Sequence, residues 1–308
     1  MIIAVTPNAA LDVTYEVDEL KPQHSHRVSA VHQRAGGKGV NVGSVLALMG
    51  HDVVATGFAG GATGAQIRAD LDSRSLRHHF VECEGESRRT INVVSAVNAE
   101  ATIFNEPGPE MSGTQWQDLL DTLCELVDST AVAVVVLAGS LPRGLAKDAY
   151  AEMIRLCRGR SARAIVDTSG APLLPAISAG PDLAKPNTAE LVEAVGIPDP
   201  VLGAAKLRRM GARDVVISAG SDGLMLLTGH GQGWRGRLAE PLHGNPTGAG
   251  DAAVAALAAG MVTGATAHDM VQAAVAWSAA AVLQPVAGQV NPDDVHWLYG
   301  QVLMEEYP

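Results

Sequence analysis

Short apolar runs alternate with amphipathic helical segments along the whole chain, and this alternation leaves few folds open. The run from Ala131 to Ala138 is almost wholly apolar, which is typical of a parallel strand that helices cover on both faces. Helical stripes flank it, formed by Trp116, Leu119, Leu120, Leu123 and Val127 before it and by Tyr150, Met153, Ile154 and Cys157 after it. Further elements are expected as a helix from Lys38 to Met49 and as strands at Ile2 to Thr6, Asp52 to Phe58, Ala164 to Asp167, Val215 to Ser218 and Leu224 to Leu227. We therefore predict an α/β fold with a doubly wound, mostly parallel sheet that binds ligands at the carboxyl ends of its strands.

Two regions instead alternate polar and apolar residues with a period of two. They pair Val13 to Val17 with Arg27 to Gln33, and Ile91 to Val97 with Ala101 to Phe104. Neither is followed promptly by a crossover helix, so we expect antiparallel hairpins set apart from the parallel core. Residues 1–308 should then form a single domain with a lid, made of segments about 12–35 and 87–106, that covers the site or joins two subunits into a homodimer. The alternative is an edge extension of the main sheet without a functional role.

The charge and the composition bound the choice of partners and of compartment. The formal net charge of −11 disfavours nucleic acid and anionic membranes, because both require a basic face on the protein. The first residues lack the pattern of a signal peptide and no apolar run approaches the ~18 residues of a membrane span, so we expect a cytoplasmic protein. The three cysteines are far apart and have no metal-ligand spacing, which favours reduced thiols. In so acidic a chain, an enzyme that handles phosphate would need locally placed Lys and Arg side chains, helix N-termini or metal ions.

The strongest local signal is the sequence Gly248-Ala249-Gly250-Asp251, which opens a run of small, helix-forming residues. Small residues allow close approach of a ligand to the backbone, and the first turn of a helix offers unpaired N–H groups to an anion. A carboxylate at such an anion pocket can act as the base in a phosphoryl transfer, while Gly248, Ala249 and Gly250 stabilise the migrating group. The alternative is that Asp251 only caps the helix.

A second glycine-rich entry into a helix is Gly36-Gly37-Lys38-Gly39, with Asn41 shortly after it. It has neither the spacing of a Walker P-loop nor that of a dinucleotide site. Its glycines would give a ligand access to the backbone while Lys38 and Asn41 present polar groups, although a tight structural turn explains the same residues.

The segment from Lys185 to Glu190 follows another expected strand and places Asn187 three residues before Glu190. That pair could hold a hydrated Mg²⁺, which prefers hard oxygen ligands and keeps several waters. The alternative is a capping box, with Asn187 at the N-cap and Glu190 at the third helical position.

Taken together, and in this order along the whole chain, these motifs resemble those of the PfkB family of carbohydrate kinases. The resemblance implies a ribokinase-like fold, ATP and Mg²⁺ as cofactors, and phosphorylation of a sugar with Asp251 as the base. It implies that Asp12, Gly37, Lys38, Asn41 and Asn105 bind the sugar, and that Glu190 and Asn187 hold the metal. It also implies nucleotide contacts from Lys185, Asn187, Ser218, Gly220 and Gly223.

Within the family, the chain is most similar to the branch of 1-phosphofructokinases and tagatose-6-phosphate kinases. The residues that carry this likeness are Thr6 to Asp12, Phe104 to Pro109, Gly139 to Gly144 and Asp167 to Gly170. The branch usually has Pro directly after the Asn of the first motif, whereas here Pro7 precedes Asn8.

The branch keeps cations for the phosphate that its substrate already carries, and here Arg27 and Arg89 match them, with Arg88 as the alternative to Arg89. We therefore expect the transfer of a phosphoryl group from ATP to fructose 1-phosphate. Fructose 6-phosphate, tagatose 6-phosphate or an unphosphorylated sugar is the alternative acceptor. A nicotinamide-dependent dehydrogenase would need a dinucleotide fingerprint that the sequence lacks.

Overall fold

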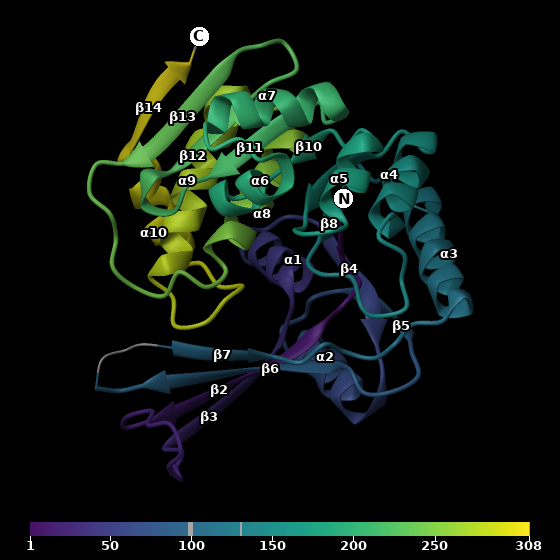
Figure 1. Ribbon diagram of the computed structural model, residues 1–308, viewed down its shortest axis with the longest axis vertical. Coiled ribbons are helices and arrows are strands. Elements are labelled where there is room, and N and C mark those ends of the chain that lie inside the picture. The colour runs from purple at the N-terminus through teal and green to yellow at the C-terminus, as the bar shows by residue number, and fades with distance from the viewer. Residues whose placement is uncertain (98–100, 130, 308) are drawn as a thin grey trace.

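The computed structural model describes residues 1–97, 101–129 and 131–307, and a ten-stranded sheet forms the body of this part of the chain (Figure 1). Seven neighbouring strands run parallel, in the order β5 (His78–Glu82), β4 (Val53–Ala59), β1 (Ile2–Thr6), β8 (Val134–Ala138), β9 (Arg163–Asp167), β10 (Leu183–Ala184) and β11 (Asp214–Ser218). The antiparallel strands β12 (Leu224–Leu227), β13 (Gly233–Leu238) and β14 (Val302–Tyr307) extend the sheet beyond β11. The predicted α/β fold with a mostly parallel sheet is confirmed.

Helices cover both faces of this sheet, which explains why its central strands are apolar throughout. In β1, Ile2 and Ala4 belong to one buried cluster, whereas Ile3 and Val5 belong to the other. The first face is covered by α1 (Lys38–Leu48), α2 (Gly61–Ser73), α8 (Ala249–Thr263), α9 (Ala267–Val282) and α10 (Pro292–Tyr299). The second is covered by α3 (Gly113–Ser129), α4 (Ala149–Gly159), α5 (Leu173–Ser178), α6 (Thr188–Val195) and α7 (Pro200–Met210). None of the described helices is long and apolar enough to cross a membrane.

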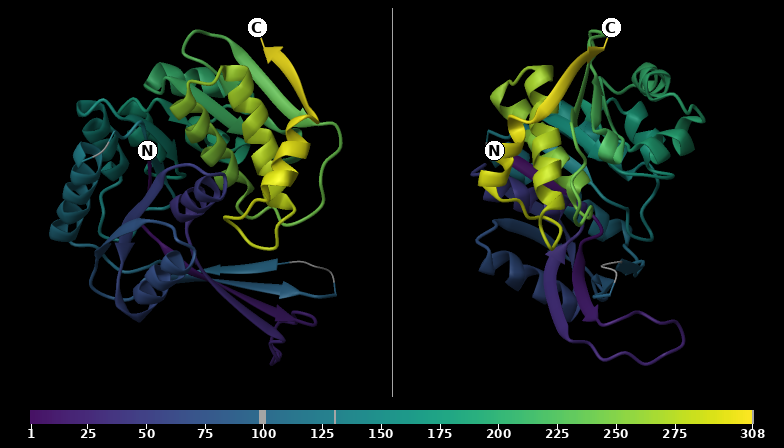
Figure 2. Two further views of the ribbon diagram at one scale, coloured as in Figure 1. Left: turned by 180° about the vertical axis from the view of Figure 1, so that it is seen from behind. Right: turned by 90° about the vertical axis from the view of Figure 1, so that its left-hand side faces the viewer.

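The two predicted hairpins come together in one separate four-stranded sheet that projects from the body (Figures 1 and 2). Its order is β3 (Ala30–Gly36), β2 (Ala10–Val17), β6 (Arg88–Ser95) and β7 (Ala101–Asn105). Each hairpin is antiparallel, as predicted, and β2 and β6 join the hairpins by a parallel pairing. Because this sheet is not hydrogen-bonded to the main one, the alternative of an edge extension is wrong. We call this sheet the lid.

One boundary in the lid differs from the prediction. The strand expected from Arg27 begins only at Ala30, so Arg27 lies in the connection between β2 and β3. The period-two pattern of this segment is too short to locate the start of a strand, which is fixed instead by pairing of Ala30 with Glu16.

Candidate active site

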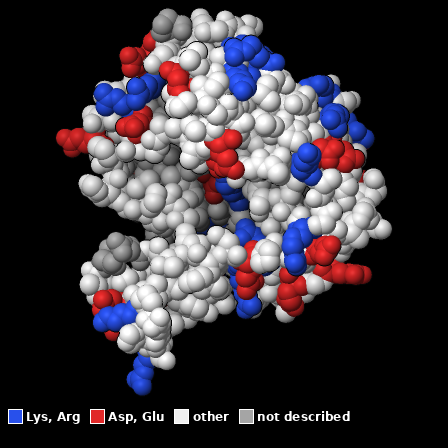
Figure 3. All heavy atoms as spheres, in the orientation of Figure 1, with Lys and Arg blue, Asp and Glu red and all other residues white. Residues whose placement is uncertain are grey.

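A cavity of about 820 Å³ lies between the body and the lid, and Figure 3 shows the hollow with acidic and basic side chains gathered at its inner end. The body contributes Asp167 from the end of β9 and Ser218 from the end of β11, while the lid contributes Asp12 and Asn105. The first turns of α1 and α8 close the inner end. The cavity therefore occupies the position predicted from the fold, at the carboxyl ends of the parallel strands.

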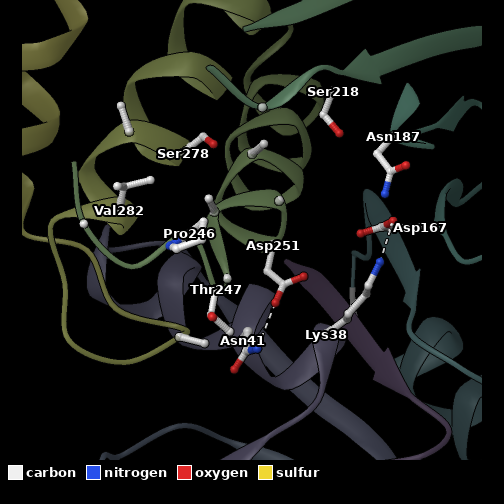
Figure 4. Close-up of a pocket in the computed structure, with 18 of the residues that line it drawn as sticks. Lys38, Asn41, Asp167, Asn187, Ser218, Pro246, Thr247, Asp251, Ser278 and Val282 are labelled. Carbon is white, nitrogen blue, oxygen red and sulfur yellow. Dashed lines mark hydrogen bonds and ion pairs between the residues drawn. The ribbon is translucent and has the colours of Figure 1, made fainter. Parts of the chain in front are cut away.

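Asp251 lies in the first turn of α8 and points into this cavity (Figure 4). The helix begins after Gly248, whose φ of 86° is in the left-handed region, and no side chain caps this end. Asp251 is only 6% exposed, and its Oδ2 accepts a hydrogen bond of 2.8 Å from Nδ2 of Asn41. The N–H groups of Gly250 and Asp251 donate to no other described residue. The capping alternative for Asp251 is thus wrong, and the helix end remains free to receive an anion.

Burial raises the pKa of Asp251 from 3.8 to about 6, and the negative charge of Asp167 acts in the same direction. Lys38 and the hydrogen bond from Asn41 oppose this rise because they favour the ionised form. A carboxylate with a pKa close to neutrality is ionised at pH 7 and still binds a proton well, which suits a general base.

Two ammonium groups converge on a buried carboxylate beside Asp251. Oδ1 of Asp167 lies 3.1 Å from Nζ of Lys38 and 3.7 Å from Nζ of Lys185. Burial alone would lower the pKa of Lys38, but Asp167 and Asp251 outweigh this effect and the pKa is raised, so Lys38 stays charged. Oδ2 of Asp167 is buried without a hydrogen-bond partner in the described structure. The cluster supplies the local positive charge that an acidic chain needs to hold phosphate groups.

Asp167 was not among the predicted site residues, although the sequence contained a signal for it. An acidic residue at the carboxyl end of a central apolar strand lies at the edge of the sheet where ligands bind.

Asn187 and Glu190 form the capping box that was the alternative to a metal site. The side chain of Asn187 accepts from the N–H of Glu190, and Oε2 of Glu190 accepts from the N–H of Asn187, both at 2.8 Å. Both residues also line the cavity. The box uses one carboxylate oxygen of Glu190, so the other is available to a ligand.

Asp12 and Asn105 of the lid line the cavity, as does Gly37 at the start of α1. Burial raises the pKa of Asp12, while a hydrogen bond with Thr90 and the charge of Arg88 lower it. Arg88 also lines the cavity, and its Nε donates to the backbone oxygen of Asn8 at 3.0 Å. This end thus combines a carboxylate, an amide and a guanidinium, which together can bind sugar hydroxyls and an anionic group.

The structure places neither Arg89 nor Arg27 in the cavity. Successive residues of a strand point to opposite faces, so Arg88 and Arg89 of β6 diverge. Arg89 is half-exposed and pairs with Glu106 at 3.3 Å, and Arg27 is exposed in its loop. All the other predicted residues line the cavity, namely Asp12, Gly37, Lys38, Asn41, Asn105, Lys185, Asn187, Glu190, Ser218, Gly220, Gly223, Gly248, Ala249, Gly250 and Asp251.

Comparison with known proteins agrees with this geometry. Residues 3–294 match the family described as pfkB family carbohydrate kinase. The chain belongs to this family. It is 34% identical over 319 residues to the 1-phosphofructokinase of Xanthomonas campestris pv. campestris, covering 99% of this chain and 98% of that protein.

Two solved structures place this pfkB kinase among proteins of the same fold. Phosphofructokinase-2 from Escherichia coli, solved in complex with fructose-6-phosphate, is 26% identical with a TM-score of 0.89, covering 97% of this chain and 98% of that one. The ribokinase of Arabidopsis thaliana, complexed with ribose and ATP, is 19% identical with a TM-score of 0.76 over 97% and 98% of the two chains, which shows a shared fold. The fold is therefore ribokinase-like.

As a carbohydrate kinase, the chain uses ATP, and one end of the cavity is suited to a nucleotide base. That end is apolar and is formed by the connection before α8 and by α9, with Leu238, Pro241, Leu242, Val275, Ala279 and Val282 in its wall. Ser278 and His243 add polar groups there. Sequence analysis did not find these residues, because they share no local motif and only the packing of α9 against β12 and β13 brings them together.

Proposed function

We propose that this kinase transfers the γ-phosphoryl group of ATP to fructose 1-phosphate and forms fructose 1,6-bisphosphate. The observation that carries the proposal is Arg88. Its guanidinium is half-buried in the cavity beside Asp12, and no carboxylate lies within ion-pair distance of it among the described residues. Burial lowers the pKa of Arg88, and the negative charges of Asp12 and Glu106 offset this effect only in part. The charged guanidinium therefore still lacks a full ionic partner. A phosphate on the substrate would complete that pair.

The identity to a 1-phosphofructokinase supports fructose 1-phosphate as the acceptor. The structural relative from Escherichia coli that was solved with fructose-6-phosphate favours the second candidate, in which fructose 6-phosphate or tagatose 6-phosphate is phosphorylated at its 1-hydroxyl. Both candidates need the same anchor and the same base.

In the proposed reaction, Asp251 accepts the proton of the attacking hydroxyl as that oxygen bonds to the γ-phosphorus. The bond from phosphorus to the bridging oxygen breaks, and ADP leaves with the electron pair. The free N–H groups of Gly250 and Asp251 would bind the migrating phosphoryl oxygens, and Lys38 and Lys185 would balance their charge. Asn41 orients the carboxylate through its 2.8 Å hydrogen bond.

The residues present fit a hydrated Mg²⁺. The second carboxylate oxygen of Glu190 and the unpartnered Oδ2 of Asp167 are hard oxygen atoms, whereas the described residues contain no group of three or more His, Cys, Asp or Glu that would form an all-protein cage. This is the donor set that Mg²⁺ takes when waters and phosphates complete its coordination. Glu190 and Asn187 would hold the ion, with Oδ2 of Asp167 as a further oxygen donor, and the ion would neutralise charge on the ATP phosphates.

We also propose a homodimer through the lid. Val31 and Phe104 are large apolar side chains on the face of this sheet that points away from the cavity, and 54% and 57% of their surfaces are exposed. Contact with a second copy would remove this surface from water and would protect the open edges of the sheet.

An ADP-release assay over a panel of sugars tests the acceptor. We expect fructose 1-phosphate to exceed free fructose in kcat/KM by at least about 100-fold, because a neutral sugar leaves the half-buried guanidinium of Arg88 without an anionic partner, and loss of one side of such a charge pair costs about 2–5 kcal/mol. Fructose 6-phosphate and tagatose 6-phosphate are the comparison substrates, and a higher kcat/KM for either would establish the second candidate. A higher kcat/KM for free fructose than for every phosphorylated sugar would contradict both.

A further inference from the structure

Arg34 connects the lid to the catalytic end of the cavity. It lies on β3, and its NH2 group donates a 3.0 Å hydrogen bond to the carbonyl oxygen of Gly288. Gly288 belongs to the segment between α9 and α10, which we call the 284–291 segment. The bond therefore joins the sugar-binding sheet directly to the layer of helices that carries Asp251.

The 284–291 segment packs against the groups that hold Asp251 and the anion. A methyl group added to Gly288 would come within 2.9 Å of Oδ1 of Asn41, and Nδ2 of Asn41 donates to Asp251. A methyl group added to Gly248, where α8 begins, would come within 2.8 Å of Cβ of Ala287. The backbone of Gly288 thus packs closely against Asn41, and that of Gly248 against Ala287, so a shift of the segment would move the partner of the base and the first turn of α8.

The same segment is held on its other side by residues next to the active-site loop. Nδ2 of Asn245 donates to the carbonyl oxygen of Pro285 at 3.0 Å. The backbone N–H of Asn245 donates to the carbonyl oxygen of Val282, the last residue of α9, at 2.9 Å. Asn245 opens the loop that leads to Gly248. The segment thus lies between Arg34 of the lid and the loop that precedes the base.

The surroundings of Arg34 indicate a role beyond folding. Its Nε is buried without a hydrogen-bond partner in the described structure, and its one side-chain bond is to a neutral carbonyl. Burial and Arg74 lower the pKa of Arg34 to about 10, against the charges of Asp70 and Asp12, so it remains protonated at neutral pH. A partly buried cation whose Nε lacks a hydrogen-bond partner costs stability, and a functional role would account for this cost.

Arg34 lines a small cavity of about 70 Å³ together with Asp12 and Thr90 on the lid side and Thr247 and Ala287 on the body side. The same four residues also line the large cavity. Arg34 therefore lies between the proposed sugar site at Asp12 and the proposed anion site at the start of α8.

We propose that Arg34 is a positioning residue that couples the lid to the catalytic end of the cavity. When a sugar phosphate fixes Asp12 and the lid, Arg34 fixes the 284–291 segment, and that segment holds Asn41 and the first turn of α8 in place for phosphoryl transfer. This coupling rests on the proposed role of Asp251 and of the helix end.

Replacement of Arg34 by Gln tests the coupling. We expect kcat to fall about 100-fold, since a displacement of about 1 Å at the reacting groups costs that much, while the KM for ATP changes less than about threefold. Arg34→Lys, which keeps a cation that can reach the carbonyl, should recover at least a tenth of the parent kcat. The matched control is Arg209→Gln on the exposed face of α7, which should leave both constants unchanged. A kcat of Arg34→Gln within threefold of the parent, or an Arg34→Lys variant as slow as Arg34→Gln, would overturn the coupling.

Hydrogen exchange provides a second readout that does not depend on turnover. In the parent protein, fructose 1-phosphate alone should slow exchange of the amides of 286–291, and in Arg34→Gln this response should disappear. Unchanged exchange there in the parent at saturating sugar phosphate would refute the coupling while the kinase activity stands. Absence of ADP release with every hexose phosphate would instead refute the proposed function.

Discussion

Replacement of Asp251 by Asn should abolish turnover and at the same time stabilise the fold. The folded protein holds this carboxyl group with a pKa of about 6, compared with 3.8 in an exposed chain. Since one pKa unit corresponds to 1.36 kcal/mol, ionisation of the buried group at pH 8 costs up to about 3 kcal/mol of folding free energy. Asn has nearly the same volume, carries no charge, and can accept the hydrogen bond that Asn41 donates.

The sign of the pH dependence follows from the raised pKa. Well below pH 3.8 the group is protonated in both the folded and the unfolded state, so it costs nothing. As the pH rises from 4 through 6 the unfolded chain ionises first, and the stability that the protonated group contributes is lost. The advantage of Asp251→Asn should therefore be about 3 kcal/mol at pH 8 and about half of that at pH 5.

Chemical denaturation of the parent and the variant at these two pH values measures the difference. Asp118→Asn, an exposed site on α3, is the matched control and should change the unfolding free energy by less than about 0.5 kcal/mol at either pH. Turnover of Asp251→Asn should fall by roughly 10² to 10⁴, since the amide cannot accept the proton. A variant that is less stable than the parent at pH 8, or that retains more than about a fifth of its turnover, would refute the reasoning.

Three other predictions concern the substrate, the metal and the assembly. Arg88→Ala should lower kcat/KM for fructose 1-phosphate by about 30-fold or more and spare free fructose, whereas Arg89→Ala should change neither, and the reverse ranking would show that the wrong arginine faces the sugar. Glu190→Gln should raise the Mg²⁺ concentration needed for half-maximal activity, and a titration curve that overlays the parent curve would place the metal elsewhere. Phe104→Glu should shift the mass measured by light scattering from dimer to monomer, and an unchanged mass would exclude this face of the lid as the contact.

The body of the fold could be predicted where strands are long, apolar and buried on both faces. β1 and β12 were placed at their observed bounds, and β9 begins one residue earlier than predicted. The strand expected before Lys185 is the two-residue β10, whereas β13 and the edge strand β14 carry no such pattern. These strands form because a neighbouring strand offers unpaired backbone N–H and C=O groups. Their own sequences do not show that such a neighbour exists.

In the candidate site, too, residues that form a local sequence motif could be predicted, whereas residues whose placement depends on distant strands could not. Gly248 to Asp251 and Lys38 to Asn41 could be recognised because a glycine-rich turn and the helix after it are neighbours in the sequence. The choice between Arg88 and Arg89 could not be made, because a shift of one residue exchanges the two faces of a strand. Pairing of Arg88 with Ala10 and of Arg89 with Leu11 fixes that register, and β2 lies far away in the sequence.

In the structure, Asn187 and Glu190 can form a helix cap and still leave an oxygen atom of Glu190 for a metal ion. The capping box occupies Oε2 of Glu190 and fixes the direction of the carboxylate, while its other oxygen accepts no hydrogen bond from the described residues and lies at the wall of the cavity. A ligand that is already oriented loses less conformational entropy on binding a metal than a free side chain does. The cap therefore supports the proposed metal role. Glu190→Gln isolates that role, because a Gln side chain can keep the cap through its carbonyl oxygen while it removes only the negative charge.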